Sequence, residues 1–427
     1  MKSYLNMTTD ERRAELASLI DLYEHEKTKG HKLDMSRGKP NPTQLDLSMD
    51  MLRQDPDGLI HTRHGTDVRN YGELTGVDEA RELFADLLGV EPDHIIMGGQ
   101  SSLALMYDSV IKAMVLGVYG GARPWGQQGK IKFLCPAPGY DRHFSICQEF
   151  GIEMVSIPMT PAGPDMDLVR KYVEGDASVK GIWCVPKYSN PQGYTYTPGT
   201  VDAFAALKPA ADDFRIFWDN AYYVHGFRDE DDYLENIFHA CKKYGSEDMV
   251  YQFTSTSKVT FSGAGVAVLC ASVNNVKFLL RQIGIQTIGY DKINQLRHVK
   301  FLGSVEGIKA HMKKQAECLR PKFDCTLERL DQELTDLEIG SWTRPNGGYF
   351  ISFDGLPGTA KRCVELCARA GVVLTAAGAA FPYGIDPRDS NIRIAPSYPT
   401  VDELKNCIHM FCLCQRIAAL EALLKDE

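Results

Sequence analysis

The sequence lacks an excess of basic residues, and it lacks long uninterrupted apolar runs. Its 427 residues include 47 Lys and Arg against 56 Asp and Glu, which leaves a net charge of −9. This balance argues against a nucleic-acid-binding surface, because a phosphate backbone requires a basic patch. The apolar runs are short, so we expect no membrane span. Met1 to Asp10 contains no apolar core, so we expect no signal peptide.

The cysteine pattern does not suggest a disulfide framework. Several of the 12 cysteines lie inside apolar runs, among them Cys135, Cys184 and Cys270. Cysteines in such runs are typical of buried, reduced thiols. We therefore expect a cytoplasmic protein.

Three further cysteines lie near a histidine in the last predicted helix. Cys407, Cys412 and Cys414 with His409 have a spacing that could indicate a metal site. Cys412 shares one helical face with apolar residues, which favours core packing instead. We predict no metal site.

The chain is too long for one compact core, so we expect a large domain and a smaller one. Strand-like and helical segments alternate over much of the chain, which predicts an α/β fold with a mostly parallel sheet covered by helices on both faces. The strand-like segments are residues 94–97, 131–135, 154–157, 181–185, 215–218, 249–254 and 266–270. In such sheets ligands bind at the carboxyl ends of strands, so residues just after each strand are candidates for chemistry.

From about residue 300 the pattern changes. A long polar helix leads to short strands at 349–352 and 391–394, and Thr400 and Glu403 begin a last helix with capping-box spacing. These features indicate a second, α+β domain. We predict an N-terminal arm with part of the small domain over 1–60, the large domain over 61–300 and the rest of the small domain over 301–427.

A lysine follows one of the predicted strands. Ser255-Thr256-Ser257-Lys258 comes directly after the strand-like run at 249–254. A lysine among small hydroxyl residues at a strand end can lie in a cleft, and an unprotonated lysine amine is the nucleophile that forms a Schiff base with an aldehyde cofactor. Taken alone, the tetrapeptide is also compatible with a serine-rich surface loop.

Three other strand ends carry polar or aromatic groups. Gly99-Gln100-Ser101 lies between a strand and a helix, where backbone N–H groups can form an anion site, although glycines also make tight turns. Tyr140 presents an aromatic ring, for which simple packing is the alternative. Asn190 offers an amide that can donate to an oxygen. His225 is expected to be a hydrogen-bonded structural imidazole.

A carboxylate also follows one of the predicted strands. Asp219 directly follows the apolar strand at 215–218, and Tyr222 lies three residues further on. A carboxylate in apolar surroundings is costly unless it meets a cation. The pyridinium nitrogen of pyridoxal phosphate (PLP) is such a cation, and its ring is an electron sink for an α-carbanion. We therefore predict a PLP site, in which Asn190 and Tyr222 bond the ring's phenolic oxygen and Lys258 anchors the aldehyde and moves the α-proton.

The chain resembles a fold-type I PLP-dependent aminotransferase of class I along nearly its whole length. The matching residues are Tyr71, Gly72, Gly98, Gly99, Gln100, Ser101, Tyr140, Asn190, Pro191, Gln192, Gly193, Asp219, Tyr222, Ser255, Lys258 and Arg393. More narrowly, residues 36–40, 70–76 and 255–258 resemble a bacterial subgroup of aspartate aminotransferases, distantly related to the PLP-binding domain of MocR-type transcription regulators. The resemblance implies a mostly parallel seven-stranded sheet between helices, plus a smaller α+β domain.

The resemblance also implies positions for the subunits and the substrate. It implies a homodimer with both active sites at the interface, where Tyr71 reaches the neighbouring subunit's phosphate. It implies that Arg393, with its planar fork, binds the substrate α-carboxylate. Gly38 would lie over the substrate, beside Asn190.

One position departs from the family pattern. Many class I enzymes have a phosphate-binding arginine eight residues after the lysine, where this chain has Val266. We therefore expect neutral groups to hold the phosphate. These would be the backbone N–H groups of Gly99, Gln100 and Ser101, the hydroxyls of Ser255 and Ser257, and Tyr71 from the neighbouring subunit.

Together these features predict an aminotransferase that works by ping-pong kinetics, with aspartate as the expected donor and 2-oxoglutarate as the expected acceptor. A lyase or decarboxylase that uses the same cofactor is one alternative. A PLP-binding sensor without turnover is another, although the segment before the pocket residues is too short and too acidic for a DNA-binding domain. The residue that would bind a second substrate carboxylate is open among Arg37, Lys39 and Arg297.

Overall fold

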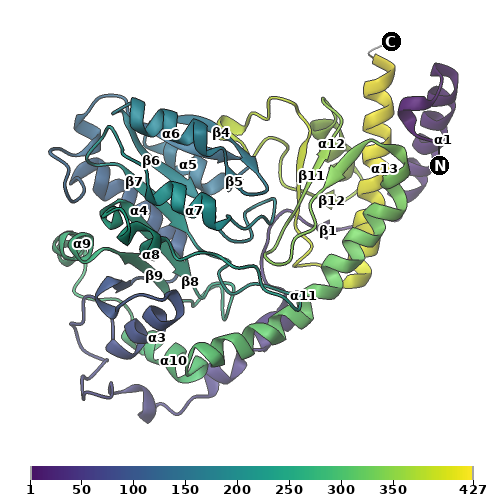
Figure 1. Ribbon diagram of the computed structural model, residues 1–427. Helices are drawn as coiled ribbons and strands as arrows, with labels where there is room; N and C mark the ends of the chain where they lie inside the picture. The colour runs from purple at the N-terminus through teal and green to yellow at the C-terminus, as the bar shows by residue number, and fades with distance from the viewer. Residues whose placement is uncertain (1, 426–427) are drawn as a thin grey trace.

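The computed structural model describes residues 2–425 and shows a large sheet flanked by helices, beside a unit of shorter strands (Figure 1). The sheet has eight strands in the order β2-β9-β8-β7-β6-β3-β4-β5. They are β2 (Ile95–Met97), β3 (Lys132–Ala137), β4 (Glu153–Thr160), β5 (Gly163–Pro164), β6 (Val179–Cys184), β7 (Arg215–Asp219), β8 (Val250–Ser255) and β9 (Ala267–Ala271). All seven predicted strands are present. The predicted total of seven is one too few, because β5 has only two residues and no alternating pattern to detect.

The prediction of a mostly parallel sheet is confirmed. Strands β4, β3, β6, β7 and β8 run parallel to one another. The exceptions are at the edges, where β9 is antiparallel to β8, β2 to β9, and β5 to β4. The carboxyl ends of the five central strands therefore lie at the same edge of the sheet.

Each face of the sheet has its own hydrophobic core, because successive strand residues point to opposite faces. In β7, Phe217 belongs to one core, and Ile216 and Trp218 belong to the other. The first core includes residues of α4 (Ser102–Val115), α5 (Asp141–Glu149) and α9 (Val273–Gln286). The second includes residues of α3 (Asp78–Leu88), α6 (Met166–Gly175), α7 (Pro198–Ala205), α8 (Ile237–Lys242) and α10 (Lys292–Leu302). Strands covered on both faces read as continuous apolar runs, which is why the sequence revealed them.

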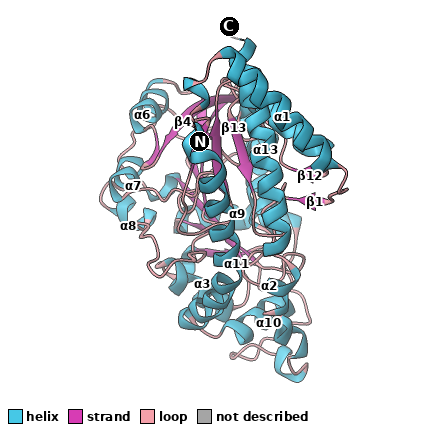
Figure 2. Ribbon diagram, turned by 90° about the vertical axis from the view of Figure 1, so that its right-hand side faces the viewer, coloured by secondary structure: helices cyan, strands magenta, loops and turns pink. Residues whose placement is uncertain are grey.

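Segments from both ends of the chain share the core of the smaller unit. Its antiparallel sheet has the order β10-β11-β13, and β1 pairs in parallel with β12. Helix α1 packs along α13, as both views show (Figures 1 and 2). The elements are α1 (Thr9–Lys27), β1 (Leu33–Asp34), β10 (Gly340–Trp342), β11 (Ile351–Gly355), α12 (Ala360–Arg369), β12 (Val372–Val373), β13 (Asn391–Ile394) and α13 (Val401–Lys425).

The predicted capping boxes are both present. Thr8 and Glu11 cap α1 reciprocally, and Thr400 and Glu403 exchange the same backbone bonds at the start of α13. Helix α13 is long and apolar enough to span a membrane by length and composition, but most of its side chains are buried in the core of the smaller unit.

Helix α11 (Val305–Leu334) connects the two parts of the molecule (Figure 1). It contacts α3 and α10 beside the large sheet and α13 in the smaller unit. The remaining short elements are α2 (Pro42–Asp46) and 3₁₀ turns at Tyr4–Asn6, Met49–Arg53, Asp57–Leu59, Pro92–His94, Trp125–Gln127, Glu247–Met249, Thr335–Leu337 and Pro382–Gly384.

Gly307 lies in the first turn of α11, where the chain passes close to the end of α10. A Cβ there would clash with the carbonyl oxygen of Leu302. Gly307→Ala should therefore lower the free energy of unfolding by about 1–3 kcal/mol, as overpacking does, although alanine is normally the better helix former. Gly284→Ala in α9 is the matched control, because its Cβ would meet only Leu74 Cδ2 at 3.4 Å. Urea denaturation measures both, and equal effects would contradict the proposed clash.

Candidate active site

Four strand ends bring the predicted side chains to one edge of the sheet. Asp219 is the last residue of β7 and Ser255 the last of β8, while Asn190 follows β6 and Tyr140 follows β3. The four strands are neighbours and parallel. Their carboxyl ends, and the residues that follow, therefore converge where ligands bind in open α/β sheets.

The side chains of this edge act on one another electrostatically. Burial raises the pKa of the Tyr140 phenol to about 12, an effect that the Lys258 charge opposes and that Tyr222 and Asp219 reinforce. Burial also raises the pKa of the Tyr222 phenol, and Arg393 opposes that rise. Contacts agree with this proximity: His143 meets both Tyr140 and Asp219, and Tyr222 lies beside Lys258 and beside Phe350, over which Arg393 lies.

Lys258 lies half-buried in the turn after β8, with its Nζ 4.7 Å from the centroid of the Tyr222 ring. Its carbonyl oxygen accepts hydrogen bonds from His225 Nε2 at 3.3 Å and from the Tyr349 hydroxyl at 3.4 Å. Burial lowers the pKa of His225 to about 3, so the imidazole is neutral. The predicted structural role of His225 is confirmed, and the amine of Lys258 projects from a fixed backbone.

A second imidazole holds the same turn. His298 Nε2 lies 3.0 Å from Thr256 Oγ1 and 2.9 Å from Thr260 Oγ1, and its Nδ1 lies 2.8 Å from the carbonyl oxygen of Asn294. Nδ1 therefore carries the proton, and Nε2 accepts from the Thr256 hydroxyl, while the Thr260 hydroxyl donates to the Thr256 carbonyl oxygen. Burial lowers the pKa of His298 to about 4, because a protonated ring would place a charge in the core.

Helix α11 reaches the turn from the other side. The carbonyl oxygen of Val259 accepts a hydrogen bond from His311 Nε2 at 2.8 Å and one from Gln315 Nε2 at 3.2 Å. Residues on both sides of Lys258 are thus bonded to helices α10 and α11.

Asp219 is 3% exposed, and only one of its carboxylate oxygens is bonded. Oδ2 lies 3.1 Å from His143 Nε2, and the His143 ring stacks on Trp183 with centroids 4.4 Å apart. Oδ1 is buried and has no hydrogen-bond partner within residues 2–425. A buried carboxylate oxygen without a donor is costly. Asp219 Oδ1 is therefore suited to accept a hydrogen bond from a protonated ring nitrogen of a ligand, such as the pyridine nitrogen of PLP.

Sequence reasoning did not identify His143. It lies three residues after Tyr140, in the first turn of α5. That spacing after a strand end was its only signal, and it could not show that the ring turns toward β7.

Arg393 in β13 is 7% exposed and lies over the Phe350 ring, with its guanidinium carbon 4.9 Å from the ring centroid. Nη1 donates to Asn190 Oδ1 at 3.2 Å and to Asp141 Oδ1 at 2.9 Å, and Nη2 donates to Thr375 Oγ1 at 3.2 Å. Because arginine only donates, Asn190 presents its oxygen to Arg393, which leaves its Nδ2 to donate elsewhere.

Gly38 lies against the Phe350 ring, with which any Cβ at this position would clash. The structure therefore places Gly38 beside the residue on which Arg393 rests. Of its two charged neighbours, Arg37 is exposed, and Lys39 Nζ lies 3.8 Å from the centroid of the Tyr398 ring.

The residues predicted at the phosphate form a hydroxyl-rich corner. Ser255 Oγ donates to Ser257 Oγ at 3.2 Å, and Ser257 Oγ donates to the carbonyl oxygen of Gln100 at 3.0 Å. Ser101 is the N-cap of α4, so this corner adjoins the positive end of that helix. Gly99 precedes it, with open space where its Cβ would lie.

Val266 supplies no cation to this corner. Its side chain is 3% exposed and belongs to a hydrophobic core of the sheet. Its backbone is bonded to Thr256, whose N–H donates to the Val266 carbonyl oxygen at 2.9 Å.

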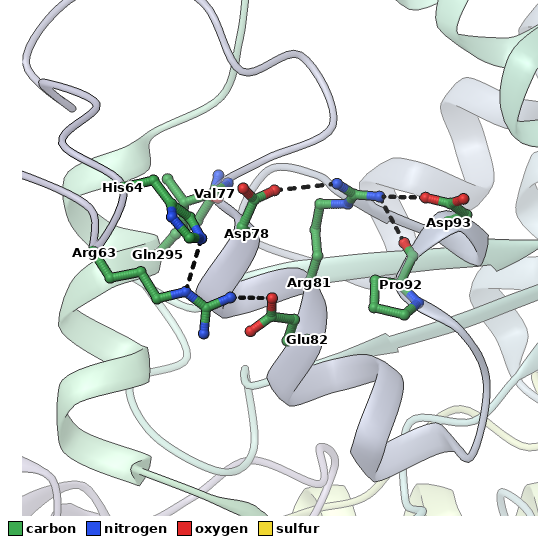
Figure 3. Close-up of polar contacts among 9 residues, drawn as sticks. All are labelled: Arg63, His64, Val77, Asp78, Arg81, Glu82, Pro92, Asp93 and Gln295. Carbon is green, nitrogen blue, oxygen red and sulfur yellow. Dashed lines mark hydrogen bonds and ion pairs between the residues drawn. The ribbon is translucent and has the colours of Figure 1, made fainter.

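Tyr71 lies apart from these side chains, and its ring is 80% exposed. The segment around it is nevertheless anchored. Lys292 Nζ donates to the carbonyl oxygen of Gly72 at 3.1 Å, and Arg63 pairs with Glu82 of α3 (Figure 3). An exposed aromatic ring on an anchored segment is typical of a surface that another molecule covers.

The cysteines of the last helix pack as predicted. Cys407, Cys412 and Cys414 are buried in the core of the smaller unit, and His409 Nδ1 lies 3.0 Å from Glu333 Oε1. Within residues 2–425, no group of three or more His, Cys, Asp or Glu side chains is arranged to hold a metal ion.

A lysine after one parallel strand and a buried aspartate at the end of the neighbouring strand, beside an α+β unit, fit the class of fold-type I PLP-dependent enzymes. Comparison with known proteins agrees: residues 7–427 match the family described as aspartate amino-transferase. The chain belongs to this family.

Individual relatives support the assignment. An aspartate aminotransferase from Corynebacterium glutamicum is 44% identical over 395 residues, which cover 92% of this chain and 91% of that protein. The crystal structure of an aspartate transaminase from Corynebacterium glutamicum matches with a TM-score of 0.96 and 41% identity, over 98% of this chain and 99% of that one. An α-aminoadipate aminotransferase from Thermus thermophilus, complexed with N-(5′-phosphopyridoxyl)-L-leucine, shares the fold at 19% identity, with a TM-score of 0.73 over 94% of this chain and 95% of that one.

The buried neutral state of His298 predicts a pH dependence of stability. The unfolded chain takes up this proton near pH 6.5, but the folded protein does so only near pH 4. The contribution of His298 to the free energy of unfolding is complete above pH 6.5. It decreases by about 2–3 kcal/mol as the pH drops toward 4. Urea denaturation at pH 7 and pH 4.5 should show a smaller difference between the two pH values for His298→Asn than for the parent.

The exposed His239 provides the control. His239→Asn should retain the full difference between the two pH values. A His298→Asn variant that also retains it would show that His298 is not the source.

Proposed function

We propose that this aminotransferase moves the amino group of aspartate to 2-oxoglutarate, with PLP as its cofactor, in two half-reactions by ping-pong kinetics. The observation that carries the proposal is the buried Oδ1 of Asp219, which has no hydrogen-bond partner within residues 2–425 and lies at the same edge of the sheet as Lys258. The relative from Corynebacterium glutamicum is named an aspartate aminotransferase, and this name supports aspartate as the amino donor.

The residues of the pocket fit the groups that PLP presents. Asp219 Oδ1 would accept from the pyridine nitrogen while Oδ2 stays with His143. Asn190 Nδ2 and the Tyr222 hydroxyl would donate to the ring oxygen, and Tyr140 would contribute its aromatic ring. The phosphate would meet the hydroxyls and backbone N–H groups of Gly99, Gln100, Ser101, Ser255 and Ser257. When bound, PLP supplies an electron sink next to the substrate α-carbon.

The chain supplies the attachment, the proton transfer and the orientation. The Lys258 amine would hold the cofactor covalently, and once the substrate has displaced it, take and return the α-proton. His225 and Tyr349 keep its backbone in place during this exchange. Arg393 would bind the α-carboxylate and thereby orient the α-hydrogen toward the amine.

The exposed Tyr71 supports a homodimer in which this ring reaches the phosphate of the neighbouring subunit. The twelve cysteines are all unpaired in the structure, which supports a reducing compartment, the cytoplasm. Gly38 would close over the substrate beside Phe350 and Asn190.

The proposed transfer is tested with the parent protein and Lys258→Ala. The parent should convert aspartate and 2-oxoglutarate into equal amounts of oxaloacetate and glutamate, and the variant should lose nearly all turnover because it lacks the amine that moves the proton. Release of ammonia or carbon dioxide by the parent would instead indicate a lyase or a decarboxylase. Cofactor binding without any product would indicate a sensor.

Covalent attachment separates the role of Lys258 from a loss of folding. Borohydride should fix the cofactor on the peptide that contains Lys258 in the parent, and on no peptide of Lys258→Ala, as read by mass spectrometry. Lys187→Met is the matched control, because Lys187 is also buried and follows β6; this variant should still be labelled at Lys258. Labelling of Lys258→Ala elsewhere would refute the assignment.

Arg393→Leu tests α-carboxylate binding. A charge-assisted pair in a partly dry site contributes on the order of 2–4 kcal/mol, so the KM should rise roughly 30- to 1,000-fold for every amino acid substrate, with PLP affinity unchanged. Arg388→Leu, at an exposed arginine five residues earlier, should leave both unchanged. A loss confined to dicarboxylic substrates would assign Arg393 to the substrate side chain instead.

A further inference from the structure

The guanidinium of Arg393 is already paired with a carboxylate of the chain itself. Asp141 Oδ1 accepts from Nη1 at 2.9 Å. This pair joins β13 of the smaller unit to the first residue of α5 on the large sheet. The Arg393 side chain is 7% exposed and the Asp141 side chain 30% exposed, so the pair is largely withdrawn from solvent.

Arg393 uses three of its five N–H groups within residues 2–425. Nη1 donates to Asp141 and Asn190, and Nη2 donates to Thr375. Nε is buried and has no partner within residues 2–425. Nε and the second N–H of Nη2 therefore remain for a bidentate contact with a substrate carboxylate, on the same guanidinium that Asp141 already bonds.

Asp141 also places a negative charge where the substrate would place another. Two carboxylates bonded to one guanidinium repel each other, and the repulsion is strong where solvent is excluded. Binding of the second carboxylate therefore weakens the bond to the first.

We propose that Asp141 is a specificity-determining residue that competes with the substrate α-carboxylate for Arg393. The proposal rests on the proposed role of Arg393 in substrate binding. An anion with only a carboxylate meets the repulsion of Asp141 with no other gain, so it binds weakly. An amino acid also engages the pocket through its amino group, and this gain offsets the repulsion. The pair thus protects the site from the simple carboxylates and inorganic anions of the cell.

A purely positioning role for Asp141 predicts the opposite sign. If Asp141 only held Arg393 in place, its loss would weaken the binding of every carboxylate. If Asp141 competes, its loss strengthens that binding. Asp141→Asn separates the two, because the amide keeps the shape of the side chain and an oxygen for Nη1 while it removes the charge.

The experiment measures the binding of propionate, a carboxylate without an amino group, to the PLP-loaded protein by calorimetry. Asp141→Asn should lower the Kd of propionate roughly tenfold, and chloride should inhibit the variant at lower concentrations than it inhibits the parent. Asp141→Glu, which keeps the charge, should bind propionate as weakly as the parent. An unchanged or higher Kd in Asp141→Asn would overturn the proposal.

Two further variants test whether the effect is local to the pair. Glu149→Gln removes one charge from the exposed end of the same helix and should leave the Kd of propionate unchanged. A tenfold gain in this variant would show that the effect comes from net charge and would overturn the proposal. If Asp141→Asn does not fold, Asp141→Ser carries the same expectation, because serine is also accepted at the start of a helix.

The double variant Asp141→Asn with Arg393→Leu separates this inference from the proposed function. The gain in propionate affinity should disappear in the double variant. If Arg393→Leu alone leaves propionate binding unchanged from the parent, Arg393 is not the carboxylate site, and the proposed role of Arg393 fails together with the competition. If Arg393→Leu weakens propionate binding but Asp141→Asn does not strengthen it, only the competition is overturned.

Discussion

The bond between Asp219 and His143 is the interaction on which the rest of the site depends. A carboxylate that is 3% exposed at the end of a central strand is stable only if its charge is compensated. One oxygen meets His143, whose ring is fixed against Trp183, and the other remains available to a ligand cation. Since β7 is buried on both faces, its end cannot shift to relieve the carboxylate. A ligand cation that paired with Asp219 would therefore be placed by the strand.

Both parts of the molecule bond the turn that contains Lys258. His298 on α10 and His225 bond the Lys258 turn from the large-sheet side. Tyr349, which precedes β11, and α11 bond it from the other side. Arg393 lies on β13, the neighbour of β11. The position of the smaller unit therefore sets Lys258 and Arg393 together, and a movement of that unit would change the positions of both side chains at once.

Sequence patterns predicted the elements well because burial leaves a local signature. Strands covered on both faces are continuous apolar runs, and seven of the eight strands were found in this way. The two-residue β5 was missed because it is too short for any period. The same strand-end argument located Lys258, Asp219 and Asn190, since ligands bind where parallel strands end. His143 and Asp141 escaped it, because both lie on a helix whose side-chain directions depend on how that helix packs.

By itself the sequence determined which residues could carry chemistry: the lysine turn, the aspartate after an apolar strand, and the fold class that brings them to one edge. These properties are local, because they depend on hydrophobic period and on residue type within a few positions. Only the tertiary structure decided which of these groups already have partners. Asp219 retains one unbonded oxygen, Arg393 is shared with Asp141, and Val266 lies in the core. Partnerships of this kind join residues as far apart as β13 and α5, and their distances follow from packing rather than from any pattern along the chain.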